Sequence, residues 1–427
     1  MRKMISSPAK MPLSEVENQI YQKVLNLLPD IMLNLMAVKV NSYPTDFGSW
    51  CAELYRICDE DINFDLLEPS QLPLLKKLQG ILESGVSVSQ LKMLRVAPWP
   101  IFNGFIQQNI VLQSVEERIA LLDYLYAIKN KPLADMIEED RLMFAGKHAS
   151  THDIVVYKFD AQWFGSTKGA KIFHELFHSF PEEFDAALSY IPLIGEVNDE
   201  NYQSFVKAYT AIFTKHSSDK KAPLMPATRL LAMRRPDQFI VLTNANVDVI
   251  CQGLNIVKLN NSAFDDYWHD LIGSLRVMPW WNASKPNKDV ISKDNECDDI
   301  ESQIDVQRIE VNEVQLWHYR AILVDLFLFA NKETAQKSNY LRLLNKARNK
   351  NKLRSSSNTQ SNKVNKGVAG ATTRKYTKES VESLVDKALA NEELPPYLLN
   401  KRDSIIKAVK EGKTVEHVIK VMRAIFG

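Results

Sequence analysis

The segment at residues 174–178, HELFH, carries the clearest chemical pattern in the chain. Two histidines four positions apart lie on one face of a helix, so His174 and His178 could both bind one zinc ion. Glu175 between them could then act as a general base toward a zinc-bound water. One hypothesis for this chain is therefore a metallohydrolase with Zn²⁺ as its cofactor.

The residues around this pattern favour a helix that turns its back to the core. Five apolar residues form a stripe opposite the histidines, namely Ile172, Phe173, Leu176, Phe177 and Phe180. In this respect the segment resembles the zincin metalloprotease helix. That family needs a third protein ligand for its metal, which Glu196 or Glu200 could supply. Against this hypothesis, Pro181 ends the helix at once and no motif marks either glutamate.

A turn at residues 191–197, IPLIGEV, is the second candidate site. It joins two expected helices and resembles the helix-hairpin-helix turn of DNA-repair proteins, whose backbone N–H groups bind a phosphate. The segment at 226–256 resembles the part of helix-hairpin-helix DNA glycosylases that leads to the catalytic strand. The resemblance implies phosphate binding around Gly195 without glycosylase chemistry, because the family's catalytic lysine has no counterpart after Gly195.

Three arginines in the second of these segments add positive charge. Arg229, Arg234 and Arg235 could bind phosphate groups through bidentate hydrogen bonds. Arginine is also favoured at the C-terminal end of a helix, where it interacts with the helix dipole. The sequence leaves both roles open.

The strongest electrostatic signal lies further along the chain. Eleven lysines and arginines and no acidic residue occur between Arg342 and Lys378, although the whole chain has a net charge of only +1. A flexible polycation of this kind neutralises phosphates without reading bases, so we expect nucleic acid, preferably DNA, as a partner. The candidate contacts are Lys346, Arg348, Lys350, Lys352, Arg354, Arg374 and Lys375.

The pattern of apolar residues predicts a mainly α-helical, multidomain protein with a few short β-strands. The strands are expected at 153–160 and 238–244, which are rich in β-branched and aromatic residues. The expected parts are a helical domain at 1–140, a central, mostly helical domain at 141–340, a basic disordered linker at 341–376 and a tethered three-helix module at 377–427. The apolar positions expected to form the module's core are Val381, Leu384, Val385, Leu389, Ile405, Ile406, Val409, Val418, Ile419, Met422 and Ile425.

Two serines are expected to begin helices. Ser14 precedes an apolar pattern with helical spacing, which predicts an N-cap. Ser114, followed three residues later by Glu117, has the spacing of a capping box, in which each side chain bonds the other residue's backbone N–H.

Composition favours a cytoplasmic protein that does not enter a membrane. The four cysteines form no CxxC pair, the N-terminal residues contain no apolar signal sequence, and the most apolar run, at 321–330, is too short to span a bilayer. No GxxxxGK[ST] motif of an ATPase is present.

The stretch ATRLLAMRRPDQF…YWHDLI at 227–272 resembles accessory, non-ATPase proteins of bacterial operons that act against phages or plasmids. This resemblance implies a subunit that works with a separate nuclease, helicase or ATPase. The preferred interpretation is a non-catalytic, nucleic-acid-binding scaffold subunit with other protein subunits as partners and no cofactor. The alternatives are the HExxH zinc metallohydrolase and a protein–protein adaptor.

Overall fold

The computed structural model describes residues 1–149, 152–217, 220–286 and 311–358, together with single positions between Val385 and Val415. The chain divides into two compact units, and each is described by itself. The first comprises Met1–Ile62 and Glu68–Ser355, and the second comprises Asn63–Leu67 and Ser356–Gly427.

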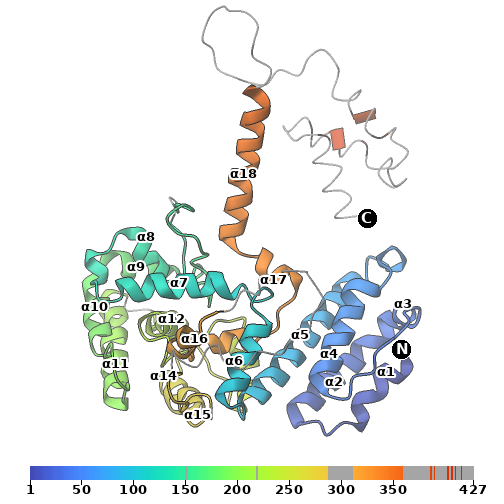
Figure 1. Ribbon diagram of the computed structural model, residues 1–427, viewed down its shortest axis with the longest axis horizontal. Coiled ribbons are helices and arrows are strands. Elements are labelled where there is room, and N and C mark those ends of the chain that lie inside the picture. The colour runs from blue at the N-terminus through green and yellow to red at the C-terminus, as the bar shows by residue number, and fades with distance from the viewer. Residues whose placement is uncertain are drawn as a thin grey trace, which may run out of the picture. The chain divides into compact units, whose positions relative to one another are not determined.

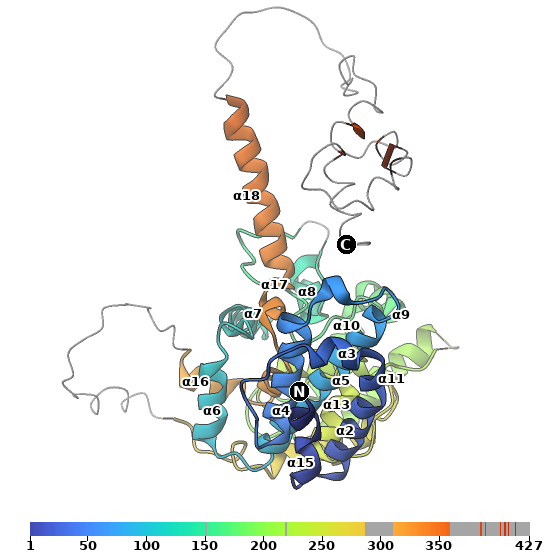
Figure 2. The same cartoon turned by 90° about the vertical axis from the view of Figure 1, so that its right-hand side faces the viewer.

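Every regular element among the described residues is helical, and no strand occurs there (Figures 1 and 2). The mainly α-helical class is thereby confirmed. The α-helices are α1 (Arg2–Ser6), α2 (Glu15–Leu27), α3 (Met32–Met36), α4 (Phe47–Arg56), α5 (Leu72–Leu94), α6 (Trp99–Gln108), α7 (Val115–Ile128), α8 (Glu138–Phe144), α9 (Lys171–Ser179), α10 (Pro181–Ser189), α11 (Asp199–His216), α12 (Leu224–Arg234), α13 (Val247–Leu254), α14 (Phe264–Asp266), α15 (Gly273–Arg276), α16 (Glu313–His318), α17 (Lys332–Gln336) and α18 (Asn339–Asn358).

The two expected helix starts have different outcomes. Ser14 and Glu17 form the capping box that begins α2. Ser114 adopts a left-handed conformation with φ of 49° and makes no side-chain cap bond at α7, so the second capping box is wrong. The carboxylate of Glu117 accepts hydrogen bonds from distant parts of the chain instead.

Helix α5 is the centre of the N-terminal half and packs against α2, α4 and α13. Two glycines allow close approach at these contacts. A Cβ on Gly85 would lie 2.5 Å from Sγ of Cys51, and a Cβ on Gly253 would lie 2.5 Å from Cβ of Leu91. One apolar core continues from α5 through α7 and α12, so the domain boundary expected at residue 140 falls inside one compact unit.

The expected strands at 153–160 and 238–244 are wrong, because both segments are turns or irregular backbone. Side chains satisfy the buried backbone of the second segment, so it needs no neighbouring strand. The hydroxyl of Thr228 accepts from N–H of Leu242 at 3.0 Å, and the hydroxyl of Tyr267 donates to the carbonyl of Ile240 at 2.7 Å.

The side chain of Arg229 likewise hydrogen-bonds the buried backbone of the segment around residue 160. It lies on α12, is 0% exposed and donates to the carbonyls of Met143, Phe144, Ala161, Trp163 and Gly165. The guanidinium therefore joins the end of α8 to the irregular backbone that follows. Burial lowers the pKa of Arg229 to about 9, which leaves the side chain charged at neutral pH.

The described positions of the second unit agree with the expected core of the C-terminal module. Five apolar residues are buried there: Val385, Leu389, Ile405, Ile406 and Val409. Arg402 forms an ion pair with Asp386 at 2.6 Å. The other residues of the three expected helices lie outside the described part of the chain, apart from Val415.

We expect Arg229→Gln to lower the free energy of unfolding by about 3 kcal/mol or more, because each unpaired buried carbonyl costs about 1–3 kcal/mol. Urea denaturation of the full chain measures this. Arg95→Gln is the matched control, because Arg95 is exposed at the end of α5. A loss below about 1 kcal/mol for Arg229→Gln would show that the buried guanidinium does not hold this region together.

Candidate nucleic-acid interface

Helix α18 occupies much of the segment that the sequence predicts to be a disordered linker, so that prediction is wrong as far as Asn358. The helix contains six basic residues and no acidic residue. Its described basic side chains, those of Arg342, Lys346 and Arg348, are exposed. In both views α18 runs outward from the other helices of its unit (Figures 1 and 2).

The helical conformation gives the basic residues a regular spacing. Positions 342, 346, 350 and 354 follow one another at intervals of four and therefore share one face of α18. Neighbours in this row are separated by about 6 Å along the helix axis. A disordered polycation has no such fixed row. The side chains of Lys350, Lys352 and Arg354 lie outside the described part, as do Arg374 and Lys375 altogether.

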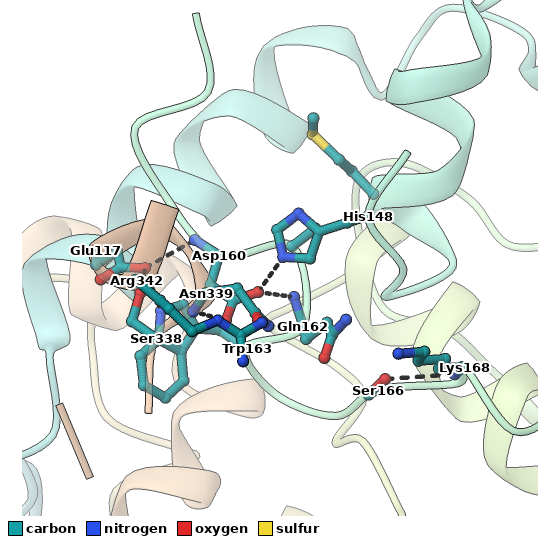
Figure 3. Close-up of polar contacts among 12 residues, drawn as sticks. Glu117, His148, Asp160, Gln162, Trp163, Ser166, Lys168, Ser338, Asn339 and Arg342 are labelled. Carbon is teal, nitrogen blue, oxygen red and sulfur yellow. Dashed lines mark hydrogen bonds and ion pairs between the residues drawn. The ribbon is translucent and has the colours of Figure 1, made fainter. Parts of the chain in front are cut away.

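The first turn of α18 is held by two carboxylates, those of the buried Asp160 and the half-buried Glu117 (Figure 3). Asp160 Oδ2 accepts from the backbone N–H of Asn339 at 2.6 Å, and Ser338 Oγ donates to Glu117 Oε1 at 2.6 Å. A carboxylate at this end also interacts favourably with the helix dipole. These contacts attach the basic helix to the core at its N-terminus.

Glu117 connects this attachment to α7 and to the segment after residue 159. Its Oε1 also accepts from the backbone N–H of Asp160 at 2.7 Å and from Nε1 of Trp163 at 2.8 Å. Burial raises the pKa of Glu117, although these hydrogen bonds oppose the change. In the sequence, the only signal at Glu117 is its spacing from Ser114, which suggests a cap and not this role.

Asp160 is the second carboxylate, and it bonds His148 as well as α18. Nε2 of His148 lies 2.5 Å from Asp160 Oδ1, which also accepts from the backbone N–H of Gln162 at 2.8 Å. Burial alone would raise the pKa of Asp160, but the hydrogen bonds from His148 and from the two backbone N–H groups lower it. The carboxylate is therefore ionised at neutral pH and can hold the helix N-terminus.

Two of the three arginines expected to bind phosphate donate hydrogen bonds to the protein's own backbone carbonyls instead. Arg229 is enclosed by carbonyls of the segments 143–144 and 161–165, and Arg235 is buried. Arg235 donates to the carbonyls of Pro192 and Gly195 and pairs with Asp237 at 2.8 Å. These two arginines are therefore structural rather than exposed phosphate ligands.

The turn at 191–197 does connect two helices, α10 and α11, as expected. Gly195 is exposed and has a φ of 80°, a conformation that favours glycine. Its carbonyl accepts from Arg235. Arg234 is only half-buried and donates from Nη1 to the carbonyl of Lys129 at 3.3 Å.

The HELFH residues do not share one environment, although they lie on one helix, α9. His174 is buried, whereas Glu175 and His178 are exposed. Nε2 of His174 donates toward the carbonyl and the hydroxyl oxygen of Thr167, each 3.0 Å away, so this nitrogen is engaged by the protein. Within the described residues, no three His, Cys, Asp or Glu side chains are grouped so that they could hold a metal.

Comparison with known proteins gives no relative for this chain. No family model matches it, and neither a curated protein nor a solved structure is significantly similar to it. In the part of the chain that the structure describes, no helix is long and apolar enough to cross a membrane.

We expect Asp160→Asn to loosen the first turn of α18, because the amide lacks the charge that favours the helix N-terminus. Hydrogen exchange at the backbone amides of 339–342 should become faster, by about tenfold for each 1.4 kcal/mol of local stability lost. Asp153→Asn is the control, because Asp153 is exposed and its carboxylate accepts from the backbone N–H of Val155 in its own turn rather than from α18. Unchanged exchange at 339–342 would exclude Asp160 as an anchor of the helix.

Burial lowers the pKa of His174 below its ordinary value of 6.5. As the pH falls, the imidazole of His174 is therefore protonated in the unfolded chain before it is protonated in the folded protein. The stability contributed by neutral His174 is complete above pH 6.5 and is lost as the pH falls below that value. We expect His174→Gln to flatten the decline of unfolding free energy below that pH by up to about 1.4 kcal/mol per pH unit. His178→Gln is the matched control, and an equal change in both variants would contradict the assignment.

Proposed function

We propose that the protein binds nucleic acid, preferably DNA, through α18 and that it does so without catalysing a reaction on it. The observation that supports this proposal is the basic helix itself, which has no acidic residue, exposes its described cations and runs outward from its unit. Lysine and arginine on such a helix neutralise phosphates and release their counterions.

Anchoring makes this helix a better ligand for phosphates than a free chain of the same charge. The bonds of Glu117 and Asp160 fix the direction in which α18 leaves the core. Fewer conformations are then lost when the helix meets a nucleic acid, which favours binding. Contacts to phosphates orient a protein on the duplex but carry no base sequence, so the proposed binding is not sequence-specific.

The wider role that we propose is that of an accessory subunit in a bacterial cytoplasmic complex, acting with other protein subunits against phages or plasmids. This part of the proposal is supported by the resemblance of residues 227–272 to accessory proteins of such operons. In such a complex the chain would supply nucleic-acid binding, and its partners would supply the catalytic activity.

The proposal is tested with the full chain and a variant in which Lys346, Arg348, Lys350, Lys352 and Arg354 are all replaced by glutamine. We expect wild-type binding to duplex DNA to weaken steeply as salt is added. In the variant, log K should fall less steeply with log salt concentration, and the magnitude of the slope should be smaller by about 0.9 for each phosphate that the variant no longer neutralises. Fluorescence anisotropy of a labelled duplex at several salt concentrations gives these slopes, and a duplex RNA of the same sequence tests the preference for DNA.

The matched control removes positive charge from another exposed helical surface. Lys76→Gln with Lys77→Gln serves this purpose, because both lysines are exposed on α5. Its slope should equal that of the wild type. Absent or salt-insensitive binding by the wild type would overturn the proposal, and so would an α18 variant that binds as the wild type does.

A further inference from the structure

A cavity of about 480 Å³ lies between the end of α7, the turn at 192–196 and the residues that follow α12. Trp281 and the segment 317–320 close its other side. This volume is within the range of small-ligand sites, which is about 300–1,000 Å³. The cavity does not involve α18, so a ligand bound in it would add a second site beyond the proposed function.

The cavity is lined by more positive than negative charge. Lys129, Arg234, Arg235 and Arg320 contribute cations, whereas the carboxylates are those of Glu196 and Asp237. Asp237 is already paired with Arg235. Glu196 is exposed at the rim, and its carboxylate lies 3.8 Å from Arg276 outside the cavity lining. An anion is therefore the favoured occupant.

Buried polar groups in the lining have unused hydrogen-bonding capacity. Nε of Arg234 and Oε1 of Gln238 are buried and have no partner among the described residues. Arg320 is 8% exposed and donates from Nε to the carbonyl of Trp281 and from Nη1 to that of Trp317. Gln238 is itself only 6% exposed. Buried polar groups are normally paired, so these point to a missing ligand.

Aromatic side chains complete the lining. The guanidinium of Arg320 lies 4.4 Å from the ring centre of Trp317 and 5.5 Å from that of Trp281. Nζ of Lys129 lies 3.5 Å from the ring centre of Tyr126. Aromatic rings and arginine planes beside one another are surfaces on which a nucleobase stacks.

We propose that this cavity binds a nucleotide, with its phosphate at Arg234 and Arg320 and its base against the aromatic side chains. Arginine donors are suited to a phosphate, and the side-chain oxygen of Gln238 accepts from an N–H group of the base. The same chemistry is offered by a free nucleotide and by the 5′-phosphorylated end of a nucleic-acid strand.

The test uses isothermal titration of the full chain with AMP, adenosine and inorganic phosphate. A second pair of titrations compares one oligonucleotide with and without its 5′-phosphate, using the α18 glutamine variant so that backbone contacts at that helix do not dominate. We expect the phosphorylated probe to bind at least about tenfold more tightly than its unphosphorylated counterpart. If the phosphate raises the affinity only in the comparison of AMP with adenosine, the ligand is a free nucleotide. If it raises the affinity of the oligonucleotide, the ligand is the 5′-phosphorylated end of a strand.

Arg234→Gln should weaken the binding of the preferred probe at least about tenfold. Arg141→Gln is the control, because Arg141 is also half-buried but lies on α8, outside the cavity lining. It should bind as the wild type does. If Arg234→Gln does not fold, Lys129→Gln takes its place, since Lys129 also brings a cation to the cavity lining and its own backbone carbonyl, which accepts from Arg234, is kept.

Three results would overturn the proposal. One is the absence of saturable binding by AMP and by the phosphorylated oligonucleotide. Another is equal affinity for the probes with and without phosphate. The third is unchanged affinity in the folded cavity variant. Loss of duplex binding in the α18 variant with AMP binding retained would show that the two sites are separate.

Discussion

The fold depends on one buried cation. Arg229 gathers five backbone carbonyls from two segments, Met143–Phe144 and 161–165, around a single guanidinium. Those carbonyls would otherwise need a neighbouring strand or water. Because a planar guanidinium offers five donors in fixed directions, it can organise irregular backbone that no regular element could cover. Gly146, which has a positive φ, leaves room for it, because a Cβ there would lie 3.3 Å from Nε of Arg229.

The segment that Arg229 holds also carries the anchor of α18. Asp160 immediately precedes the carbonyl of Ala161 that Arg229 binds, and it accepts from the first turn of the basic helix. The position of the proposed nucleic-acid-binding helix is thus linked through adjacent residues to the buried arginine. The carboxylates of Glu117 and Asp160 also bring negative charge to the start of a helix that has no acidic residue of its own.

Arginines near one another in the sequence have different uses in the structure. Arg229 and Arg235 bind the protein's own carbonyls, whereas Arg234 lines a cavity and has an unpaired Nε. Only a few residues separate the first from the other two, and this is enough to send their side chains to different surroundings. Local charge density alone therefore indicates where cations are, but not which of them a ligand can reach.

The sequence by itself determined the helical class, the capping box at Ser14 and the position of the basic stretch, because these follow from local periodicity, capping and charge. Only the tertiary structure decided that 153–160 and 238–244 form no strands, since the groups that satisfy them, such as Thr228 and Tyr267, are distant in the chain or lie on another element. It likewise decided that His174 is buried against Thr167 while His178, on the same helix, is exposed. Burial and hydrogen-bond partners depend on which elements meet in space, and residue spacing along a chain does not contain that information.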